Sequence, residues 1–331
     1  MTTEDFDVAV VGAGIAAART LRGTGLSCVV LEASGRLGGR AYTDTASLGA
    51  PFDQGAVWLH DADHNPLTPV ALGQGFALHE EKARRRRDIL LVNGRPATGQ
   101  ERAAHDAAFE AWEAAVERRA AAGGPDVPVS DAAPRGGPWD AMAAHWFGAM
   151  ISGVEAECFS LQDYAATSIA GRNPQVREGL GTLVARQAEG LDVSLGSPVE
   201  RIATGGPGGS VALEGPRGTV RARACIVTVS TGVLAAGGIR FDPALPSEVE
   251  SAIAGLPQGL LSKVALRAAG PDRLDLPEFG RLGRRVEDEG DRPASWVLWP
   301  FGRDHAIGYI GGEAAWELSR EGPAAAEAFA R

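Results

Sequence analysis

The order of apolar and polar segments near the start of the chain predicts a strand, a helix and a second strand. Residues 8–11 form a short apolar run within a strand predicted over 7–11, residues 16–22 have helix-forming composition, and residues 27–31 form a second apolar run. A glycine-containing turn follows the first run directly. Strand, turn, helix and strand in this order make up the unit from which parallel sheets are built. We therefore expect an α/β fold at the N-terminus.

The middle of the chain has a helical pattern instead. Residues 99–122 are rich in alanine and charged side chains, and Phe109, Trp112 and Val116 recur at spacings of three and four, which is typical of a buried helix face. Residues 123–138 hold four prolines and four glycines, so they predict a linker or surface loop. Residues 139–151 predict a second helix. We expect the apolar side chains of both helices to serve packing.

The second half of the chain predicts further strands, because short apolar runs alternate with glycine turns. The run 224–229 is apolar throughout, as in the centre of a parallel sheet. We expect helices over 180–188 and from Pro323 onward. The remaining strand candidates are 191–195, 199–203, 211–214, 219–223, 260–267, 296–299 and 306–310.

Composition narrows the class of protein. The chain has 331 residues, 44% of them hydrophobic, and a formal net charge of −10. Its length suggests about two domains, and its acidity argues against a nucleic-acid surface. No apolar run approaches the length of a membrane span, and the acidic N-terminus lacks the basic start of a signal peptide. The three cysteines lack metal-ligand spacing. We expect a reduced, cytoplasmic protein with no metal, nucleic-acid or membrane partner.

A nucleotide-binding fingerprint lies at the first turn. Gly12 permits a tight turn, Gly14 lets the backbone approach a pyrophosphate, and Ala17 is small enough for the helix to pack on the strand. Free N–H groups at the helix N-terminus attract phosphates. Glu32 lies 20 positions after Gly12, at the end of the second run, and can accept hydrogen bonds from ribose hydroxyls. Together these features predict a dinucleotide site.

A second glycine pair favours FAD over NAD. The run 32–40 reads Glu-Ala-Ser-Gly-Arg-Leu-Gly-Gly-Arg, and its glycines allow close backbone approach. Arg40 can neutralise diphosphate charge with its planar donor fork. An NAD domain has no need of this second clamp, so we predict a Rossmann-like FAD-binding domain. From this run we assign Ala33, Gly38, Gly39 and Arg40 to the cofactor site.

With this run, the sequence resembles the flavin-containing amine oxidases, a family that includes monoamine oxidases, polyamine oxidases and lysine-specific histone demethylases. The run 32–40 is specific to that superfamily of flavoproteins. Residues 52–60, 178–183, 226–234 and 241–246 also match. The resemblance covers essentially the whole chain.

The resemblance implies how the cofactor is held. Glu32 and Arg40 would contact the ribose and the pyrophosphate, and the backbone of Val199 would hold the adenine. Ser34 departs from the pattern, because many relatives carry an arginine there that reaches the adenosine part; one contact would be weaker. The residues that would lie along the isoalloxazine follow one another at Gly55, Ala56, Val57 and Trp58.

Lys263 is the first candidate for the chemistry. The chain has only two lysines, and Lys82 lies in a charge run typical of a solvated face, whereas Lys263 lies inside an apolar run. A desolvated ammonium there would be costly without a partner. From spacing alone, an edge-strand lysine that reaches water is the favoured explanation, and the resemblance reverses this order. The resemblance implies a catalytic lysine that holds a water against flavin N5 and assists proton movement or the reaction with oxygen.

His60 is the second candidate. The stretch 58–66 resembles the loop of polyamine oxidases in which a histidine lines the substrate channel, where an imidazole could orient an amine or influence its protonation. A loop histidine bonded to backbone is the alternative. His64 fits a structural or exposed role. The sequence contains neither a Gly-x-Ser-x-Gly run nor a His/Cys/carboxylate cluster with metal-ligand spacing.

The reaction implied is the oxidation of a carbon–nitrogen bond of a primary or secondary amine, or of a polyamine, to an imine, with O2 reduced to H2O2. The partners would be a small-molecule amine and O2. Two alternatives stay open: an FAD-dependent oxidase or desaturase of the same superfamily that acts on an amino acid, porphyrinogen or carotenoid precursor, and a non-catalytic or incomplete subunit.

We expect a discontinuous FAD-binding domain over 1–85 and 175–240, with an α+β substrate domain over 86–174 and 241–331. Family members usually continue beyond the position of Arg331, with a segment that returns to the FAD domain and supplies aromatic residues around the amine. Three explanations for the absence of this segment from the sequence stay open: a truncated product, a chain completed by a second polypeptide, and a degenerate flavoprotein. We expect Trp296, Trp299 and Tyr309 to pack on the substrate-domain sheet.

Overall fold

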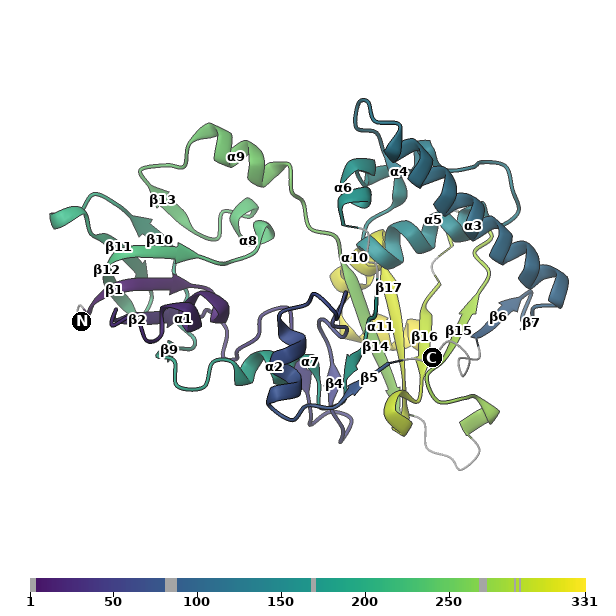
Figure 1. Cartoon of the computed structure of the whole chain (residues 1–331), viewed down its shortest axis with the longest axis horizontal. Coiled ribbons are helices and arrows are strands. Elements are labelled where there is room, and N and C mark those ends of the chain that lie inside the picture. Colours follow the sequence, from purple (N-terminus) through teal and green to yellow (C-terminus); the bar gives the residue numbers. More distant parts are fainter. Residues whose placement is uncertain (1–3, 81–87, 168–170, 268–272, 289, 292) are drawn as a thin grey trace. The chain divides into compact units, whose positions relative to one another are not determined.

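The computed structural model describes residues 4–80, 88–167, 171–267, 273–288, 290–291 and 293–331. The chain forms two compact units, each built from two separate stretches (Figure 1). The first unit comprises Met1–His79 and Asn173–Gln258, and the second comprises Glu80–Arg172 and Gly259–Arg331.

These units differ from the expected division at one boundary in particular. Residues 241–258 lie with the first unit, because strand β13 (Arg240–Asp242) pairs in parallel with β10 (Arg201–Ala203), with Phe241 opposite Ile202. Helix α9 (Ser247–Ala254) follows in the same unit. The expected boundary at residue 85, like Lys82, lies outside the described residues.

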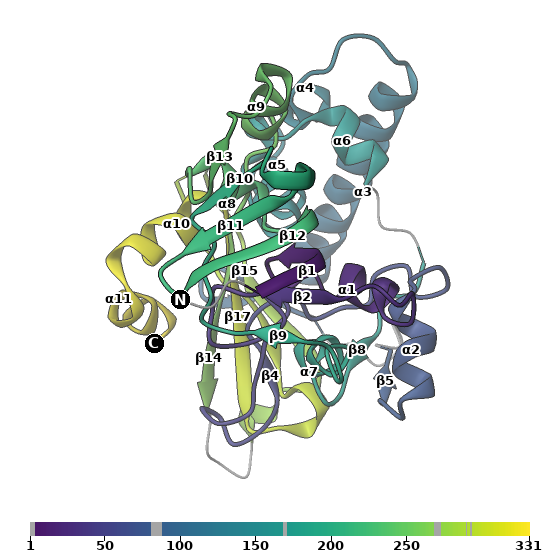
Figure 2. The same ribbon diagram turned by 90° about the vertical axis from the view of Figure 1, so that its left-hand side faces the viewer.

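A seven-stranded sheet forms the centre of the first unit, in the order β13-β10-β11-β12-β1-β2-β9 (Figure 2). Strands β12, β1, β2 and β9 run parallel, as the strand–helix–strand pattern predicts, whereas β11 is antiparallel to both neighbours. Helix α1 (Ile15–Leu21) connects β1 to β2. The remaining strands are β1 (Glu4–Val11), β2 (Cys28–Leu31), β9 (Val193–Ser194), β11 (Val211–Gly215) and β12 (Gly218–Val227).

The two strands predicted at 219–223 and 224–229 are one strand, β12. No turn-forming residue separates Arg223 from Ala224, so the chain stays extended. The first part of β12 forms a hairpin with β11, and residues Val220–Val227 pair with β1. One strand therefore joins the antiparallel and parallel parts of the sheet.

Both faces of the sheet bury apolar side chains. Ala9, Val11 and Leu31 pack on one face, and Val10 and Val30 pack with Ala18 of α1 on the other. Near-complete burial on both faces is what selects continuous apolar runs for parallel strands.

The remaining elements of the first unit are short. They are β3 (Thr43–Asp44), β4 (Phe52–Asp53), α2 (Leu67–Gly73), β5 (Leu78–His79), β8 (Gln175–Val176), α7 (Leu180–Arg186), the turn Pro207–Gly209 and α8 (Thr231–Ala235).

A six-stranded sheet forms the second unit, in the order β14-β17-β16-β15-β6-β7. The strands predicted at 260–267, 296–299 and 306–310 are confirmed as β14, β16 and β17. The sequence analysis missed β6 and β15. In the case of β15 the reason is its composition, because its two glycines and two arginines show no apolar alternation. The bounds are β6 (Asp88–Val92), β7 (Arg95–Pro96), β14 (Leu261–Arg267), β15 (Gly280–Arg284), β16 (Ser295–Leu298) and β17 (His305–Gly311).

Helices α3 (Gly99–Ala121) and α5 (Asp140–His145) lie across this sheet (Figure 1). A capping box starts α3: Thr98 Oγ1 accepts the Glu101 N–H, and Glu101 Oε2 accepts the Thr98 N–H. The bidentate Arg95 pair and these Thr98 contacts lower the pKa of Glu101 to about 2. The predicted helix 139–151 is α5 followed by a π-helical turn, Trp146–Met150.

Aromatic packing joins the helices to each other. The rings of Trp112 and Phe147 stack with centroids 4.3 Å apart, and both belong to one buried cluster. The packing role expected of Trp112 and Val116 is confirmed, since they are 1% and 0% exposed. The other elements of this unit are α4 (Val129–Ala132), Ala156–Cys158, α6 (Leu161–Ala166), Arg273–Asp275, Pro300–Gly302, α10 (Gly312–Glu321) and α11 (Pro323–Ala330).

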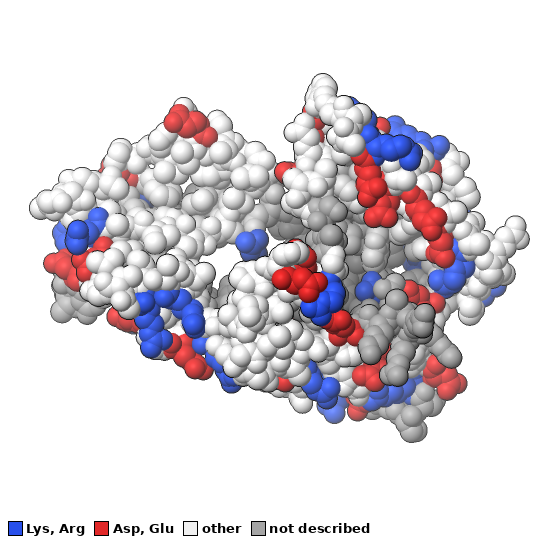
Figure 3. Space-filling view, viewed as in Figure 1, with Lys and Arg blue, Asp and Glu red and all other residues white. Residues whose placement is uncertain are grey.

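Acidic and basic side chains are interspersed on the face seen in Figure 3, without a broad field of one sign. Among the helices of the described residues, none has both the length and the apolar character required to cross a membrane.

Candidate functional site

The end of β1 and the turn after it are fixed by backbone bonds from two other strands. The Gly12 N–H donates to the Leu31 carbonyl (2.9 Å), and the Thr228 N–H donates to the Val11 carbonyl (2.8 Å). Gly12 has φ +87°, a conformation that residues with a Cβ rarely adopt. Glycine at position 12 is therefore required by the turn itself.

Glycine at position 14 is required for a different reason, because the side chains of Thr228 and Val10 lie too close to its Cα to leave room for a Cβ. A Cβ there would lie 2.5 Å from Thr228 Cγ2 and 2.8 Å from Val10 Cγ1, well inside van der Waals contact. Thr228 is held in place because its hydroxyl donates to the Val11 carbonyl (2.9 Å). Ala17 is half-buried against the Val10 cluster, in agreement with a helix that packs close to the strand. The turn 12–14 thus leaves bare backbone next to the helix N-terminus.

Glu32 is held at the end of β2 with one carboxylate oxygen engaged. It is 9% exposed, and its Oε1 accepts the Ser34 N–H (2.8 Å). Its backbone is fixed on the other side by the Ser197 N–H, which donates to the Glu32 carbonyl (2.8 Å). No hydrogen bond from a described residue reaches Oε2, so this oxygen is free to accept a ribose hydroxyl. The exposed Ala33 follows directly.

The second glycine pair bends the chain sharply after Arg36. Arg36 Nη1 donates to the Gly39 carbonyl (2.9 Å), and Gly38 has φ +94° with its missing Cβ only 2.1 Å from the Ala41 carbonyl oxygen. Arg40 is exposed and forms no ion pair with any described carboxylate. The N–H groups of Gly39 and Arg40 likewise donate to no described residue. This bend therefore offers free donors and an unpaired cation.

Residues 52–58 lie against the same bend. The Ala56 N–H donates to the Arg40 carbonyl (2.9 Å), and a Cβ on Gly55 would lie 1.8 Å from that carbonyl oxygen. Val57 is buried, Ala56 is exposed and Trp58 is half-buried. The structure therefore brings two separate sequence-predicted runs together, 38–40 and 55–58.

Asp53 and Thr43 anchor this region to helix α7, and the sequence analysis assigned neither of them a role. Asp53 Oδ2 accepts the Leu180 N–H (2.9 Å), and Oδ1 accepts the Gly181 N–H (3.1 Å). Asp53 Oδ1 also accepts the Thr43 hydroxyl, whose oxygen accepts the Thr182 N–H (2.9 Å). Free N–H groups at the start of a helix are the ones that need such acceptors. The position of Asp53 within the matching run 52–60 was the only signal in the sequence.

Val199 packs its side chain into the core of the sheet and is 9% exposed. No hydrogen bond to another described residue engages its backbone N–H or carbonyl. A free backbone pair next to a buried side chain is suited to pairing with a base edge.

His60 is exposed, and its tautomer is set by Asn173. Asn173 Oδ1 accepts the Asp61 N–H (3.2 Å) and lies 2.9 Å from His60 Nδ1. Because a carboxamide oxygen only accepts, Nδ1 must carry the hydrogen, and in the neutral ring Nε2 has the lone pair. His64 bonds to Asp61 (3.1 Å) in the open, and this contact raises the pKa of His64. The structure thus separates a positioned imidazole, His60, from an exposed ion-pair partner.

Lys263 belongs to the second unit, whereas the other sequence-predicted site residues belong to the first. It lies on β14 directly opposite Tyr309 of β17, and its Nζ is 5.4 Å from the centre of the Tyr309 ring. A cation over an aromatic face is stabilised by the ring quadrupole. Tyr309 is 5% exposed, and the packing expected of it is confirmed.

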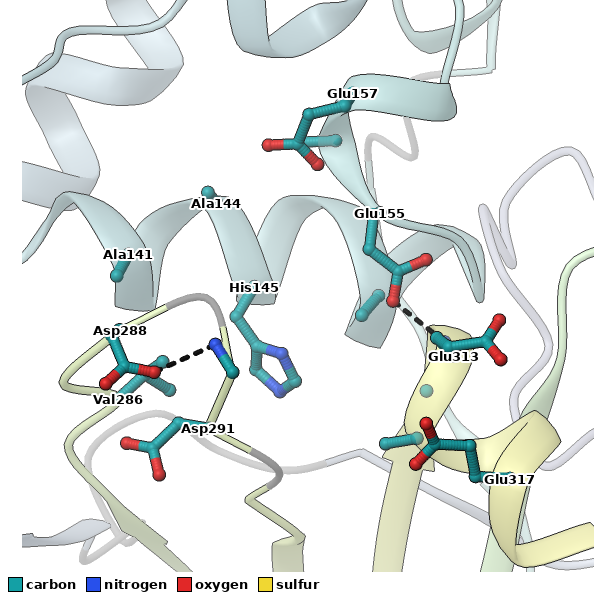
Figure 4. A pocket seen from close by; sticks show the side chains of 15 residues that line it. Ala141, Ala144, His145, Glu155, Glu157, Val286, Asp288, Asp291, Glu313 and Glu317 are labelled. Atoms are coloured by element: carbon teal, nitrogen blue, oxygen red, sulfur yellow. Dashed lines mark hydrogen bonds between the residues drawn. The ribbon is translucent and has the colours of Figure 1, made fainter.

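The second unit also has an acidic pocket around His145, which the sequence analysis did not single out (Figure 4). Its volume is about 190 Å³. Burial lowers the pKa of His145, with Glu155 and Asp291 acting in the opposite direction. Two of the carboxylates that line the pocket already accept hydrogen bonds from neighbouring residues. Glu155 Oε1 accepts the Glu313 N–H (2.8 Å), and Asp291 Oδ1 accepts from the Arg284 guanidinium (2.8 Å). These bonds give the wall carboxylates a structural role.

Among the described residues, no group of three or more His, Cys, Asp or Glu side chains is arranged so that it could hold a metal ion.

Comparison with known proteins gives consistent results. Residues 13–327 match the family model for flavin containing amine oxidoreductase. Polyamine oxidase 4 of Oryza sativa subsp. japonica is 30% identical over 287 residues, which cover 78% of this chain and 58% of that protein. Lysine-specific histone demethylase 2 of Homo sapiens is 28% identical over 276 residues, covering 77% of this chain and 33% of that protein. The chain therefore spans between a third and three fifths of the length of these relatives.

Solved structures share the fold. Putrescine oxidase bound to putrescine is 23% identical with a TM-score of 0.72, covering 97% of this chain and 79% of that one. Cyclohexylamine oxidase from Brevibacterium oxydans IH-35A is 21% identical with a TM-score of 0.68, covering 98% and 79%. The chain thus has the α/β FAD-binding fold, and the resemblance stated from its motifs is confirmed. With the family model matched from residue 13 to residue 327, the chain belongs to the flavin-containing amine oxidoreductase family.

Proposed function

We propose that this chain binds FAD and oxidises a carbon–nitrogen bond of a primary or secondary amine, or of a polyamine, with O2 as the final electron acceptor. The observation that carries the proposal is the turn 12–14, where Thr228 leaves no room for a Cβ at Gly14. Bare backbone at the end of a parallel strand is what a pyrophosphate needs in order to approach a helix N-terminus. Membership of the family supports the same conclusion.

The residues around this turn fit FAD. Glu32 Oε2 would accept a ribose hydroxyl, and the unpaired Arg40 would neutralise a phosphate. The free backbone groups of Val199 would pair with the adenine edge. The run 55–58, held by the bond from the Ala56 N–H to the Arg40 carbonyl, would lie along the isoalloxazine.

FAD, when bound, would supply the two-electron redox chemistry that couples loss of one hydride equivalent from the α-carbon of the amine to reduction of O2 to H2O2. The lone pair on His60 Nε2 would accept a proton or hydrogen bond from the substrate nitrogen, because Asn173 holds the hydrogen on Nδ1. Lys263, positioned over Tyr309, would hold a water or move a proton. Water would hydrolyse the imine product.

Cofactor binding is tested by the visible absorption spectrum of the purified chain, with and without added FAD. We expect a bound, oxidised flavin spectrum, and Arg40→Ala should raise the dissociation constant of FAD by about tenfold, as expected for one lost charge-assisted hydrogen bond. A chain that cannot be reconstituted with FAD would reject the proposal.

The chemistry is tested by anaerobic flavin reduction with a panel of amines and by peroxide release in air. Lys263→Met should slow reduction or reoxidation, whereas Arg267→Met, at the exposed end of the same strand, should leave both rates unchanged. If Lys263→Met keeps both rates of the wild type, the role assigned to Lys263 is wrong. If no amine reduces the flavin, the oxidase proposal fails.

A further inference from the structure

Gln175, on strand β8 of the first unit, has a buried amide group that the protein leaves unsatisfied. The residue is 4% exposed. Its Nε2 is fully buried and donates to no residue that the structure describes. A buried donor without an acceptor costs free energy, because the group has lost its hydrogen bonds to water and gained none in return. We therefore looked for the acceptor that this amide would meet in the working protein.

Gln175 is the middle one of three residues that lie side by side on neighbouring strand segments. Trp58 forms an antiparallel bridge with it on one side. His79 of β5 lies directly opposite it on the other side. Residues directly opposite each other on antiparallel strands share a face. The side chains of Trp58, Gln175 and His79 therefore project from the same face.

The other face of these strand segments belongs to the hydrophobic core. Leu59 and Val176 follow Trp58 and Gln175 in the chain, and they are 1% and 2% exposed within one buried cluster. Because successive side chains of an extended segment point to opposite faces, Trp58 and Gln175 point away from that cluster. The Gln175 amide is thus not part of the apolar packing of its own unit.

The face that carries Gln175 adjoins the run proposed to lie along the isoalloxazine. Trp58 is the last residue of that run, 55–58. The ring of His60 lies on the same side, with its centroid 6.1 Å from that of Trp58, and Asn173 contacts it from two positions before Gln175. One buried donor, Gln175 Nε2, therefore lies beside the segment that would contact the flavin.

The chemistry of the donor selects its acceptor. An amide N–H only donates. The nitrogen of a neutral amine substrate has one lone pair, and a hydrogen bond to it would withdraw the electrons that assist loss of hydride from the α-carbon. The pyrimidine ring of an oxidised isoalloxazine has carbonyl oxygens and unprotonated nitrogens instead. A flavin atom is therefore the acceptor that suits a fixed donor on this face.

We propose that the Gln175 side-chain amide donates a hydrogen bond to the pyrimidine ring of bound isoalloxazine and thereby favours reduction of the flavin. This inference rests on the proposed binding of FAD. Hydrogen bonds to the ring nitrogens are among the means by which a protein tunes a cofactor. A hydrogen bond to a charged acceptor is about twice as strong as one to a neutral acceptor, so the amide would stabilise the reduced, anionic ring more than the oxidised ring.

Gln187 provides a matched control. It is a glutamine of the same unit and is similarly buried, at 6% exposed. Its Nε2, however, donates to the Leu183 carbonyl (2.8 Å) and to Gln74 Oε1 (2.9 Å). Gln187→Met would leave these acceptors unsatisfied, whereas Gln175→Met would leave no acceptor of the described chain unsatisfied. Only the Gln187 variant should therefore lose stability without FAD.

The experiment compares wild type, Gln175→Met and Gln187→Met in three measurements: the urea midpoint of the FAD-free chain, the dissociation constant of FAD from flavin fluorescence, and the reduction potential of bound flavin against reference dyes. For Gln175→Met we expect a urea midpoint at or above that of wild type and a dissociation constant raised about fivefold. Its equilibrium constant for flavin reduction should fall about tenfold, which is about 30 mV for a two-electron couple. Gln187→Met should lower the urea midpoint and keep the wild-type potential.

A wild-type potential in Gln175→Met would overturn the inference, and weaker amine binding at that unchanged potential would assign the amide to the substrate instead. A urea midpoint as low as that of Gln187→Met would also overturn it, since the amide would then serve the folded chain. The two proposals fail separately. A lowered potential in Gln175→Met, without flavin reduction by any amine, would support the flavin contact and reject the oxidase function. Amine oxidation with an unchanged potential in Gln175→Met would support the function and reject the contact.

Discussion

Replacement of Asp53 by alanine tests how the proposed flavin-facing segment is anchored. The carboxylate is 9% exposed and accepts the N–H groups of Leu180 and Gly181, the first two residues of α7. It also accepts the hydroxyl of Thr43, which binds the Thr182 N–H in turn. One side chain therefore connects strand β4, strand β3 and the start of a helix.

The magnitude follows from the groups left without an acceptor. Each buried N–H that loses its partner costs about 1–3 kcal/mol, and loss of an N-terminal cap typically costs about 0.5–2 kcal/mol. We expect Asp53→Ala to lower the free energy of unfolding by about 3–5 kcal/mol, since these contributions overlap. Asp53→Asn keeps one acceptor oxygen and should cost about half as much.

Urea titration followed by circular dichroism measures this difference, with Asp131→Ala as the control because Asp131 forms only an exposed ion pair. FAD affinity should fall in parallel, because residues 55–58 begin only two positions after Asp53. A loss below about 1 kcal/mol for Asp53→Ala would refute the reasoning, since it would mean that water replaces the carboxylate at the helix N-terminus.

Three further predictions concern the first turn, the histidine and pH. Gly14→Ala should cost about 1–3 kcal/mol of stability through overpacking and abolish retention of FAD on a desalting column, while Gly73→Ala in α2, where a Cβ meets nothing, should behave as wild type. Asn173→Ala should turn the single Nδ1–H tautomer of His60 into a mixture, as read from its ring ¹⁵N shifts; a mixture already present in wild type would contradict the assignment. Burial lowers the pKa of His305 from 6.5 to about 4. The unfolded chain therefore binds this proton more readily, and the free energy of unfolding should fall as pH drops from 6.5 to 4. Urea titrations of His305→Gln should show a smaller fall over this range, and a fall equal to that of wild type would contradict the prediction.

Local features of the sequence determined much of the fold and of the cofactor site. Gly12 and Gly14 directly follow an apolar run, and Glu32 ends the next one, so the strand–turn–helix–strand unit could be predicted from spacing. The long helix α3 could be predicted for the same reason, since its apolar positions and its start lie within one stretch of chain. Such patterns report on neighbours along the chain, which is why they found the family and its cofactor.

Only the tertiary structure decided which distant groups meet. Thr228 explains why Gly14 has no Cβ, Asp53 caps a helix 127 positions away, and Asn173 sets the tautomer of a histidine 113 positions away. The sheet of the second unit likewise depends on β15, which pairs with β6 and β16 although its sequence has no strand-like alternation. Contacts of this kind depend on which strands pair and which faces are buried, and that is settled when the whole unit packs, because burial of apolar surface is a property of the assembled fold and not of any single segment.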